Sequence, residues 1–453
     1  MPKVTSFFRQ ILVLIPVYVG SIFSGMGYSW VASYMMLLQS EENNSTPYTI
    51  QQCTLLALAM HIGRITSAFI SVLVLGKFGR KIPLIIAYVL FLISAGMVLI
   101  STAYVVVASS RFVNGIANGV HECFGTIYLG EIPSKKIRGM ICSSVTAFFN
   151  FGILAQYALG TYMSYVNGAI LRISLATVLV LSTYYLIESP YHLKPLDSDK
   201  AMKTIAWLQA IPSKQAQQEL ENINVENANL IDFVKRFKKP EVYKSFGLAL
   251  SLGFIATVMT VVVSSFANFI IPETDYLNSH QFAILLTIVP IVMYTLSALI
   301  IDHLGRRLLL LVGFSLGIFF NALITLLYYM EETSILNIPN FSWVIFFIIV
   351  MFLITYFLSI SPTANALRTE LFPTSCKVIG VSLTVVCNSL AYLFGTVFFL
   401  RISEFYGLYL NFLIYCVCCL VGLILVSAYL PETKGKSLSE IQEILRGENK
   451  TVS

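Results

Sequence analysis

Long apolar runs, each about the length that crosses a lipid bilayer, recur along this chain of 453 residues. A helix needs about 20 mostly apolar residues to span the hydrocarbon core of a bilayer. Charged residues make up 11% of the sequence, whereas about 25% is usual in soluble domains. The runs lie near residues 11–38, 50–75, 83–102, 105–130, 140–160, 169–188, 246–270, 280–302, 308–330, 341–366, 378–399 and 408–430. The sequence therefore predicts an all-α membrane protein with twelve transmembrane helices.

A polar stretch divides these predicted helices into two sets of six. We expect the following segments: an N-terminal six-helix bundle (1–190), a cytoplasmic linker with short helices (191–245), a C-terminal six-helix bundle (246–433) and a cytoplasmic tail (434–453). The eight cysteines form no framework typical of a disulfide-linked extracellular domain, and no group of metal ligands is evident. We therefore expect neither a metal nor another cofactor.

Basic residues gather at alternate ends of the predicted helices, and we count Arg368 among those on the cytoplasmic side. The outer loops carry acids instead, for example at 41–44 and 331–332. This asymmetry follows the positive-inside rule and predicts that both termini are cytoplasmic. The net charge of +6 then reflects membrane orientation and does not indicate a nucleic-acid partner. We expect the plasma membrane, with glycosylation sequons at Asn43 and Asn44 in the first outer loop.

Three short motifs occur once in each half of the chain, in the same order. They are GRK (79–81) and GRR (305–307), the acids Glu131 and Glu370 after the fourth and tenth helices, and IESP (187–190) and PETKG (431–435) after the sixth and twelfth. Duplicated six-helix halves are typical of carriers that work by alternating access.

The charged residues of these motifs are candidates for an inner gate. The predicted network contains Arg80, Glu131, Arg138, Glu188, Asp302, Arg306, Arg307, Glu370, Lys377 and Glu432. We expect ion pairs among them to hold the two bundles together while the cavity opens outward. Asp302 has no counterpart in the first half, where Gly76 occupies the matching position. The alternative is that the cations only fix the topology.

Two ionisable residues lie deep within predicted helices. Arg64 is about 18 Å from the inner end of the second helix, and Glu122 about 13–14 Å from that of the fourth, at about 1.5 Å per residue. Buried charges in membranes are usually paired or face water. We therefore predict that Arg64 and Glu122 interact, with His61 and His121 nearby. The pair either fixes helix packing or lines the pathway and binds an anionic or strongly hydrogen-bonding solute.

The motifs resemble a known family. GRK, GRR, the RFVNG and YLGEIPSKKIRG segments of residues 111–139, ESP, ELFPTSCK and PETKG are similar to those of the sugar-porter family of the major facilitator superfamily, most like the insect facilitated trehalose transporters. The resemblance implies two pseudo-symmetric six-helix bundles and a monomeric transporter, not an enzyme, that moves a small sugar or polyol by alternating access. It also implies four substrate-binding positions, which are Thr146, Thr257, Asn365 and Asn388.

The coupling mechanism is predicted from the first helix. No acid occurs in residues 1–40, so the first-helix carboxylate common in proton-coupled relatives is absent. This favours facilitated diffusion. Two alternatives stay open: a proton- or anion-coupled carrier of a different small polar solute, and a transport-silent nutrient sensor.

Overall fold

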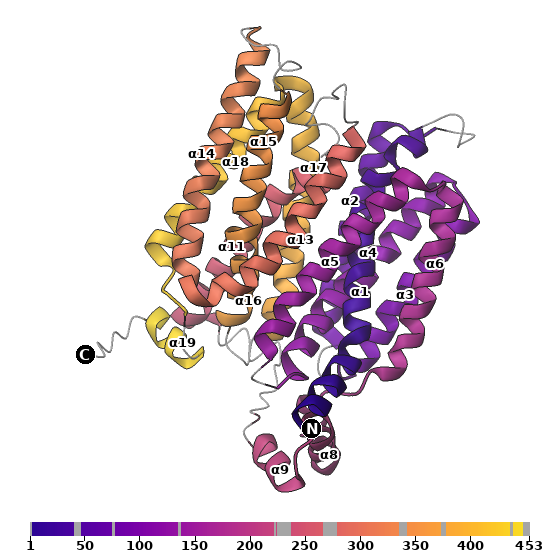
Figure 1. Cartoon of the computed structure of the whole chain (residues 1–453), viewed down its shortest axis with the longest axis vertical. Helices are drawn as coiled ribbons and strands as arrows, with labels where there is room; N and C mark the ends of the chain where they lie inside the picture. The colour runs from indigo at the N-terminus through magenta and orange to yellow at the C-terminus, as the bar shows by residue number, and fades with distance from the viewer. Residues whose placement is uncertain are drawn as a thin grey trace. The chain divides into compact units, whose positions relative to one another are not determined.

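Helices make up nearly all of the chain that the structure describes (Figure 1). The computed structural model describes residues 2–39, 47–74, 78–134, 137–221, 223, 237–265, 279–334, 342–372, 377–434 and 438–446. The predicted glycosylation sites Asn43 and Asn44, and Gly76, lie outside these residues. Ten of the described helices are long and apolar enough to cross a membrane. The prediction of an all-α membrane protein is confirmed.

The chain forms two compact units. The N-terminal unit comprises Met1–Tyr28, Met35–Gly152 and Tyr162–Leu230, and the C-terminal unit comprises Ser29–Tyr34, Ile153–Thr161 and Ile231–Ser453. The helices of the first half are α1 (Pro2–Gln39), α2 (Ile50–Val74), α3 (Lys81–Ile100), α4 (Tyr104–Glu131), α5 (Arg138–Tyr162), α6 (Tyr165–Ser182), a 3₁₀ turn (Thr183–Tyr185), α7 (Pro190–Leu193), α8 (Ser198–Gln209) and α9 (Ser213–Glu221).

The helices of the second half follow in chain order. They are α11 (Pro240–Ser265), α13 (Ser279–Leu304), α14 (Arg306–Glu332), α15 (Ser342–Thr355), a π-helix (Tyr356–Ile360), α16 (Ser361–Glu370), α17 (Lys377–Tyr406), α18 (Leu408–Tyr429) and α19 (Leu438–Arg446). Within this unit α14 packs along α18, and α11 along α17.

The predicted tenth span is interrupted. The sequence suggests one apolar helix over 341–366, whereas the structure has α15, a π-helical turn and α16. Pro362 is the second residue after the π-helical turn, and proline has no N–H with which to continue the α-helical ladder. Such π-helical turns are frequent at functional sites.

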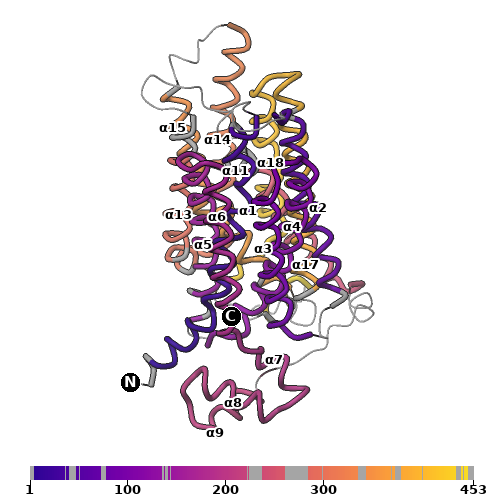
Figure 2. The backbone as a smooth tube through the Cα atoms, turned by 90° about the vertical axis from the view of Figure 1, so that its right-hand side faces the viewer, coloured from indigo at the N-terminus to yellow at the C-terminus, as the bar shows by residue number. Residues whose placement is uncertain are grey.

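Residues 191–221, which the sequence assigns to a linker, pack within the N-terminal unit. Helices α8 and α9 enclose a small apolar core that includes Ile205 and Leu220. They lie beside the start of α1 (Figure 2), where the Arg9 guanidinium donates to the Trp207 carbonyl (2.9 Å) and lies 5.3 Å from the centre of the Trp207 ring.

Helices α2 and α4 approach each other closely because small residues line their contact. A Cβ atom on Gly115 would collide with the Met60 carbonyl, and one on Gly119 with the Ser67 hydroxyl. Glycines four residues apart let two membrane helices pack backbone to backbone. Glu122 is seven residues after Gly115 and so lies on the same face of α4. This packing brings Glu122 beside α2.

Candidate functional site

The repeated motifs build a charge network at the helix ends of the N-terminal unit. We call it the N-terminal helix-end network, and its members are Gly79, Arg80, Glu131, Glu188 and Ser189. The Arg80 guanidinium donates to both carboxylate oxygens of Glu131, from Nη2 at 3.0 Å and from Nε at 3.2 Å. The Ser189 hydroxyl also donates to Glu131. Glu188 accepts from the backbone N–H of Arg80 at 2.8 Å, where α3 begins. A carboxylate is favourable there because the first N–H groups of a helix have no partner within it.

The C-terminal unit repeats this arrangement with a C-terminal helix-end network, whose members are Gly305, Arg306, Glu370, Glu432 and Thr433. Arg306 donates from Nη2 (2.9 Å) and Nε (3.2 Å) to one oxygen of Glu370, and the Thr433 hydroxyl donates to the other (2.8 Å). Glu432 accepts from the backbone N–H groups of Arg306 (3.0 Å) and Arg307 (3.1 Å) at the start of α14.

A glycine of positive φ makes room for the carboxylate in each network. Gly79 has φ +71° and Gly305 φ +88°, and a Cβ atom on either would collide with Glu188 or Glu432. Burial alone would raise the pKa of Glu432, but the backbone N–H groups of Lys434, Arg306, Arg307 and Thr433 hold it below its ordinary value. The Glu432 carboxylate is therefore stabilised in its charged form.

Most of the predicted gate residues thus meet within their own unit. Arg307 donates to the Ser427 carbonyl (2.8 Å). The side chains of Arg138, Asp302 and Lys377 lie outside the described part of the chain. The hydroxyls of Ser189 and Thr433 were not predicted, although in each half a hydroxyl residue directly follows the glutamate.

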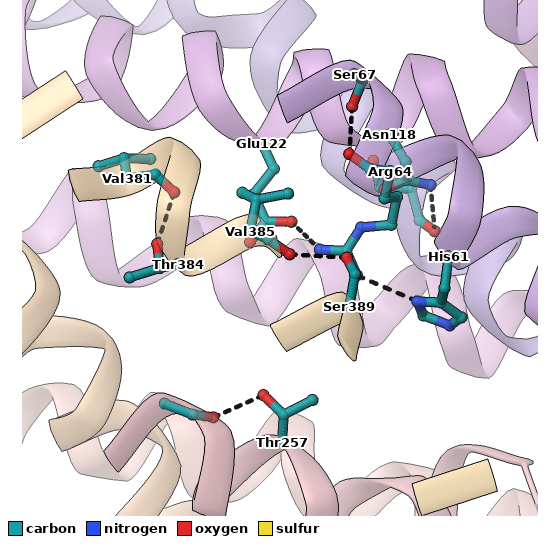
Figure 3. Close-up of polar contacts among 12 residues, drawn as sticks. His61, Arg64, Ser67, Asn118, Glu122, Thr257, Val381, Thr384, Val385 and Ser389 are labelled. Atoms are coloured by element: carbon teal, nitrogen blue, oxygen red, sulfur yellow. Dashed lines mark hydrogen bonds and ion pairs between the residues drawn. The ribbon is translucent and has the colours of Figure 1, made fainter. Parts of the chain in front are cut away.

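The structure also brings Arg64 and Glu122 together (Figure 3), and they form an ion pair between α2 and α4. The Arg64 side chain is 2% exposed, while that of Glu122 is 31% exposed. Nη1 of Arg64 lies 3.5 Å from Nδ1 of His61, one turn earlier in α2. The cation is thus held inside the unit, and the carboxylate has a solvent-accessible side.

Aromatic rings lie beside this pair. We call Arg64, Glu122, His61 and Tyr28 together the Arg64 cluster. The guanidinium carbon of Arg64 lies 5.0 Å from the centre of the Tyr28 ring. Tyr28 packs edge-on against His61 (5.4 Å) and Phe149 (5.1 Å). His121 instead lies against α1, where its Nε2 is 3.1 Å from the Ser21 hydroxyl.

A second buried arginine of this unit was not predicted as a site residue. Arg111, 2% exposed on α4, donates to the Gly27 carbonyl of α1 at 2.7 Å and lies 3.0 Å from the Met60 sulfur of α2. Its position inside the RFVNG motif of a predicted transmembrane helix was a signal for burial. These bonds join three helices of the N-terminal unit.

The C-terminal unit has a different polar cluster, the Arg368 cluster, made of Arg368, Asn388, Thr257 and Gly253. With its amide oxygen toward Arg368, Asn388 accepts from Nη1 (3.0 Å) and Nη2 (3.1 Å), and its amide nitrogen donates to the Thr257 hydroxyl (3.3 Å). Thr257 in turn donates to the Gly253 carbonyl (2.8 Å). Two of the four predicted substrate-binding residues therefore meet here.

The other two predicted substrate-binding residues lie apart from these bonds. Asn365 is half-buried on α16, three residues before Arg368 and on the same helix face. Thr146 is half-buried on α5, and its carbonyl accepts from the Asn150 amide (2.8 Å).

A family model described as "Sugar (and other) transporter" matches residues 13–445. The chain belongs to this family. It is 23% identical to the facilitated trehalose transporter Tret1 of Culex quinquefasciatus, over 98% of this chain and 87% of that protein. It is 22% identical to Tret1 of Drosophila willistoni, over 98% of this chain and 52% of that protein. The chain thus spans most of the first relative and about half the length of the second.

Solved structures give the same architecture. The proton:xylose symporter XylE bound to 6-bromo-6-deoxy-D-glucose superimposes with a TM-score of 0.76 at 18% identity, over 97% of this chain and 100% of that one. An inward-open conformation of XylE from E. coli gives 0.74 at 18% identity, over 96% and 99%. The predicted major facilitator fold is confirmed. The chain is a multi-pass membrane transporter, not an enzyme.

Proposed function

We propose that this protein moves a small sugar or polyol across the plasma membrane by facilitated diffusion, through alternating access. The observation that carries the proposal is the Arg64 cluster, where a partly exposed carboxylate is held by a buried guanidinium beside aromatic rings. Sugars present hydroxyl groups that hydrogen-bond to carboxylates, and apolar C–H faces that pack on rings. The related Tret1 and XylE proteins, named for trehalose and xylose, support the same solute class.

Facilitated diffusion is supported by the composition of α1. This helix contains no aspartate or glutamate between Pro2 and Gln39. A carrier that couples sugar to protons needs a group in the pathway that binds and releases a proton. In this proposal the Glu122 carboxylate is paired with Arg64 and binds the sugar, so without a further carboxylate on α1 transport follows the sugar gradient alone.

The helix-end networks have a supporting role in this proposal. Each ties helix starts and ends within one unit, so each half moves as a rigid body while the solute site changes access. The predicted pairing of these charges across the two bundles stays a prediction. We also propose cytoplasmic termini, a monomer in the bilayer, the segment boundaries 190/191, 245/246 and 433/434, and glycosylation at Asn43 or Asn44.

Purified protein reconstituted in liposomes tests the proposal. Labelled trehalose, glucose, xylose and sugar alcohols should enter vesicles preloaded with the same unlabelled solute, equally with and without a proton gradient. No uptake of any sugar class would refute sugar transport, and a strict need for the proton gradient would refute facilitated diffusion.

A matched pair of variants tests whether Asn388 belongs to the solute site. Asn388→Leu removes a predicted substrate-binding amide and should raise the transport KM. Asn411→Leu is the control, because the Asn411 amide donates to the Phe399 carbonyl (3.2 Å) and the Ser403 hydroxyl (2.8 Å) and so joins α18 to α17. It should lower thermal stability without changing KM in the protein that folds. Equal effects on KM would remove Asn388 from the site.

A further inference from the structure

The end of α8 is fastened to the start of α1 by several hydrogen bonds. The Ser6 hydroxyl and the Gln10 amide both donate to the Leu208 carbonyl, at 3.1 and 3.4 Å. The Arg9 guanidinium donates to the Trp207 carbonyl at 2.9 Å. Both carbonyls belong to the last turn of α8, where they have no partner within the helix. Side chains of α1 thus cap the end of a helix that lies in the predicted linker (Figure 2).

This attachment fixes the depth of Trp207 relative to the bilayer. The apolar span of α1 runs from Thr5 to Met35, and its 31 residues are about 46 Å long at about 1.5 Å per residue. A bilayer with its headgroups is about 40–45 Å thick. Arg9, about 6 Å from the start of this span, therefore lies among the headgroups. Since its guanidinium carbon is 5.3 Å from the centre of the Trp207 ring, that ring lies at the headgroup level too.

The side chains at this junction are open to their surroundings. Trp207 is 41% exposed, and Phe8, next to Arg9, is 67% exposed. Lys203 is exposed one turn before Trp207, on the same face of α8. Tryptophan is enriched at membrane–water interfaces, and an interfacial helix typically combines tryptophan with lysine or arginine. The junction therefore has the composition of a surface that rests on a bilayer.

The charge of the junction indicates which lipid it favours. A guanidinium has five N–H donors, and the Trp207 carbonyl takes one of them from Arg9. Guanidinium groups bind phosphate oxygens in bidentate fashion, and the ammonium of Lys203 adds a second positive charge. Asp199, an acid in the first turn of α8, lies on the same face but about two turns away from Trp207. On this face, the end of α8 nearest to the headgroups is therefore cationic.

We propose that Arg9, Lys203 and Trp207 form a binding surface for anionic phospholipid headgroups, which anchors the linker helices α8 and α9 to the bilayer. The phosphate accepts from Arg9, the negative headgroup attracts Lys203, and the Trp207 ring packs beside the headgroup end of the acyl chains. Anionic lipids are enriched in the cytoplasmic leaflet, where the proposed orientation puts this surface. The inference goes beyond the proposed function, since it holds for any solute.

Quenching of Trp207 by brominated lipids tests this surface. The full chain is placed in nanodiscs of neutral phosphatidylcholine that contain a rising fraction of phosphatidylglycerol or phosphatidylcholine brominated near the headgroup end of its acyl chains. The chain has 3 tryptophans, and subtracting the emission of the Trp207→Phe variant isolates Trp207. Half-maximal quenching should need about fivefold less of the brominated phosphatidylglycerol, the enrichment that about one cation provides. A high salt concentration should reduce this difference.

Charge-removing variants test the two cations. Arg9→Gln keeps an amide donor for the Trp207 carbonyl, so α8 should stay docked. Combined with Lys203→Gln, it should bring the two lipids to within about twofold of each other. Lys203→Gln alone should give an intermediate preference. Lys214→Gln, at an exposed position of α9, is the matched control and should keep the full preference.

Three results would contradict this surface. If Trp207→Phe removes no quenching by either lipid, the junction does not touch the bilayer and the inference fails. Equal quenching of Trp207 by both lipids overturns the selection of anionic headgroups. A full preference that survives in the double variant of Arg9→Gln and Lys203→Gln, with an unchanged melting temperature, overturns the role of these cations. Sugar uptake enters none of these measurements, so the proposed function stands or falls separately.

Discussion

The two units are alike at their helix ends and different in their polar clusters. At the ends, Arg80 pairs with Glu131 and Arg306 pairs with Glu370, and each carboxylate also accepts from a hydroxyl. In the clusters, the N-terminal unit has an arginine paired with a carboxylate. The C-terminal unit has an arginine bonded to a neutral amide. The two halves therefore share their helix-end framework and differ in their polar clusters.

The likeness has a structural cause. Each helix-end network satisfies backbone N–H groups at a helix start and fixes the angle between neighbouring helices, and both halves need this equally. The contacts described for the two polar clusters satisfy no backbone N–H groups at a helix start. A difference between them is therefore the better guide to selectivity than the repeated motifs are.

The largest expected effect comes from breaking the ion pair of the Arg64 cluster. Arg64→Leu and Glu122→Leu should each lower the free energy of unfolding by about 3–5 kcal/mol, because each leaves one charge without its partner. The double change should recover surface expression. Surface labelling of cells measures expression, and uptake by the same cells measures transport. The melting temperature in detergent measures stability.

Transport by the double variant separates the two interpretations of this pair. Recovered uptake means that the pair serves helix packing, and continued loss means that it belongs to the solute site. A double variant no better expressed than the single ones would show that the two residues are not partners.

The second prediction compares the glycines of the two networks. Gly79→Ala and Gly305→Ala each put a Cβ atom at positive φ against a carboxylate. Each should cost about 2–3 kcal/mol, from about 1–2 for the backbone plus the collision. Gly79→Ala should lower the free energy of unfolding more than Gly305→Ala does. A Cβ on Gly305 would lie 2.8 Å from the Glu432 carboxylate, and a Cβ on Gly79 would lie closer than that to the Glu188 carboxylate. Melting temperatures of the two variants, with Gly96→Ala as an open-space control, measure this. The reverse order would contradict it.

Helix geometry explains why the sequence was enough to predict some contacts. Arg64 and Glu122 were matched by depth alone, which works because the rise per residue of a helix is constant. The same geometry separates the side chains of Arg368 and Glu370 around α16. Residues two apart point about 200° apart around a helix, so Arg368 faces away from Glu370 and toward the side of Asn365.

Other contacts could not be predicted from the sequence. The direction of the hydrogen bonds through Asn388 depends on Thr257, which is far away in the sequence and on another helix. The motifs place charges at helix ends, but they do not say which helices pack together. Arg80 pairs with Glu131 and Arg306 with Glu370, each within its own unit. Pairing between the bundles stays a prediction.

The third prediction concerns Glu432 and pH. Its pKa is depressed in the folded protein, so its contribution is fully present above the unfolded value of about 4.3 and is lost as pH falls through the folded value. The amide of the glutamine in Glu432→Gln would turn a donor toward one of the backbone N–H groups that the carboxylate accepts from. We therefore expect this variant to lower the free energy of unfolding by about 1–2 kcal/mol at pH 7, a value that allows for the partial exposure of Glu432. The difference from the unaltered protein should stay constant from pH 5.5 to 8. A difference that changes across this range would refute the assignment. Glu188→Gln, measured alongside, tests whether the two halves behave alike.

The smallest effect is expected from the hydroxyls that complete the two networks. Ser189→Ala and Thr433→Val each remove one donor to a carboxylate that keeps its arginine, Arg80 in one case and Arg306 in the other. Each should cost about 0.5–1.5 kcal/mol, the usual net contribution of one hydrogen bond, since the remaining partner leaves the carboxylate satisfied. Because the networks are equivalent, the two losses should agree within about 0.5 kcal/mol, and their sum should equal the loss in the double variant, as expected for distant sites. Thr325→Val is the control, because its hydroxyl only donates to the Asn321 carbonyl of its own helix. A loss confined to one network would mean that the two halves, though built alike, differ in how strongly each depends on its helix-end contacts.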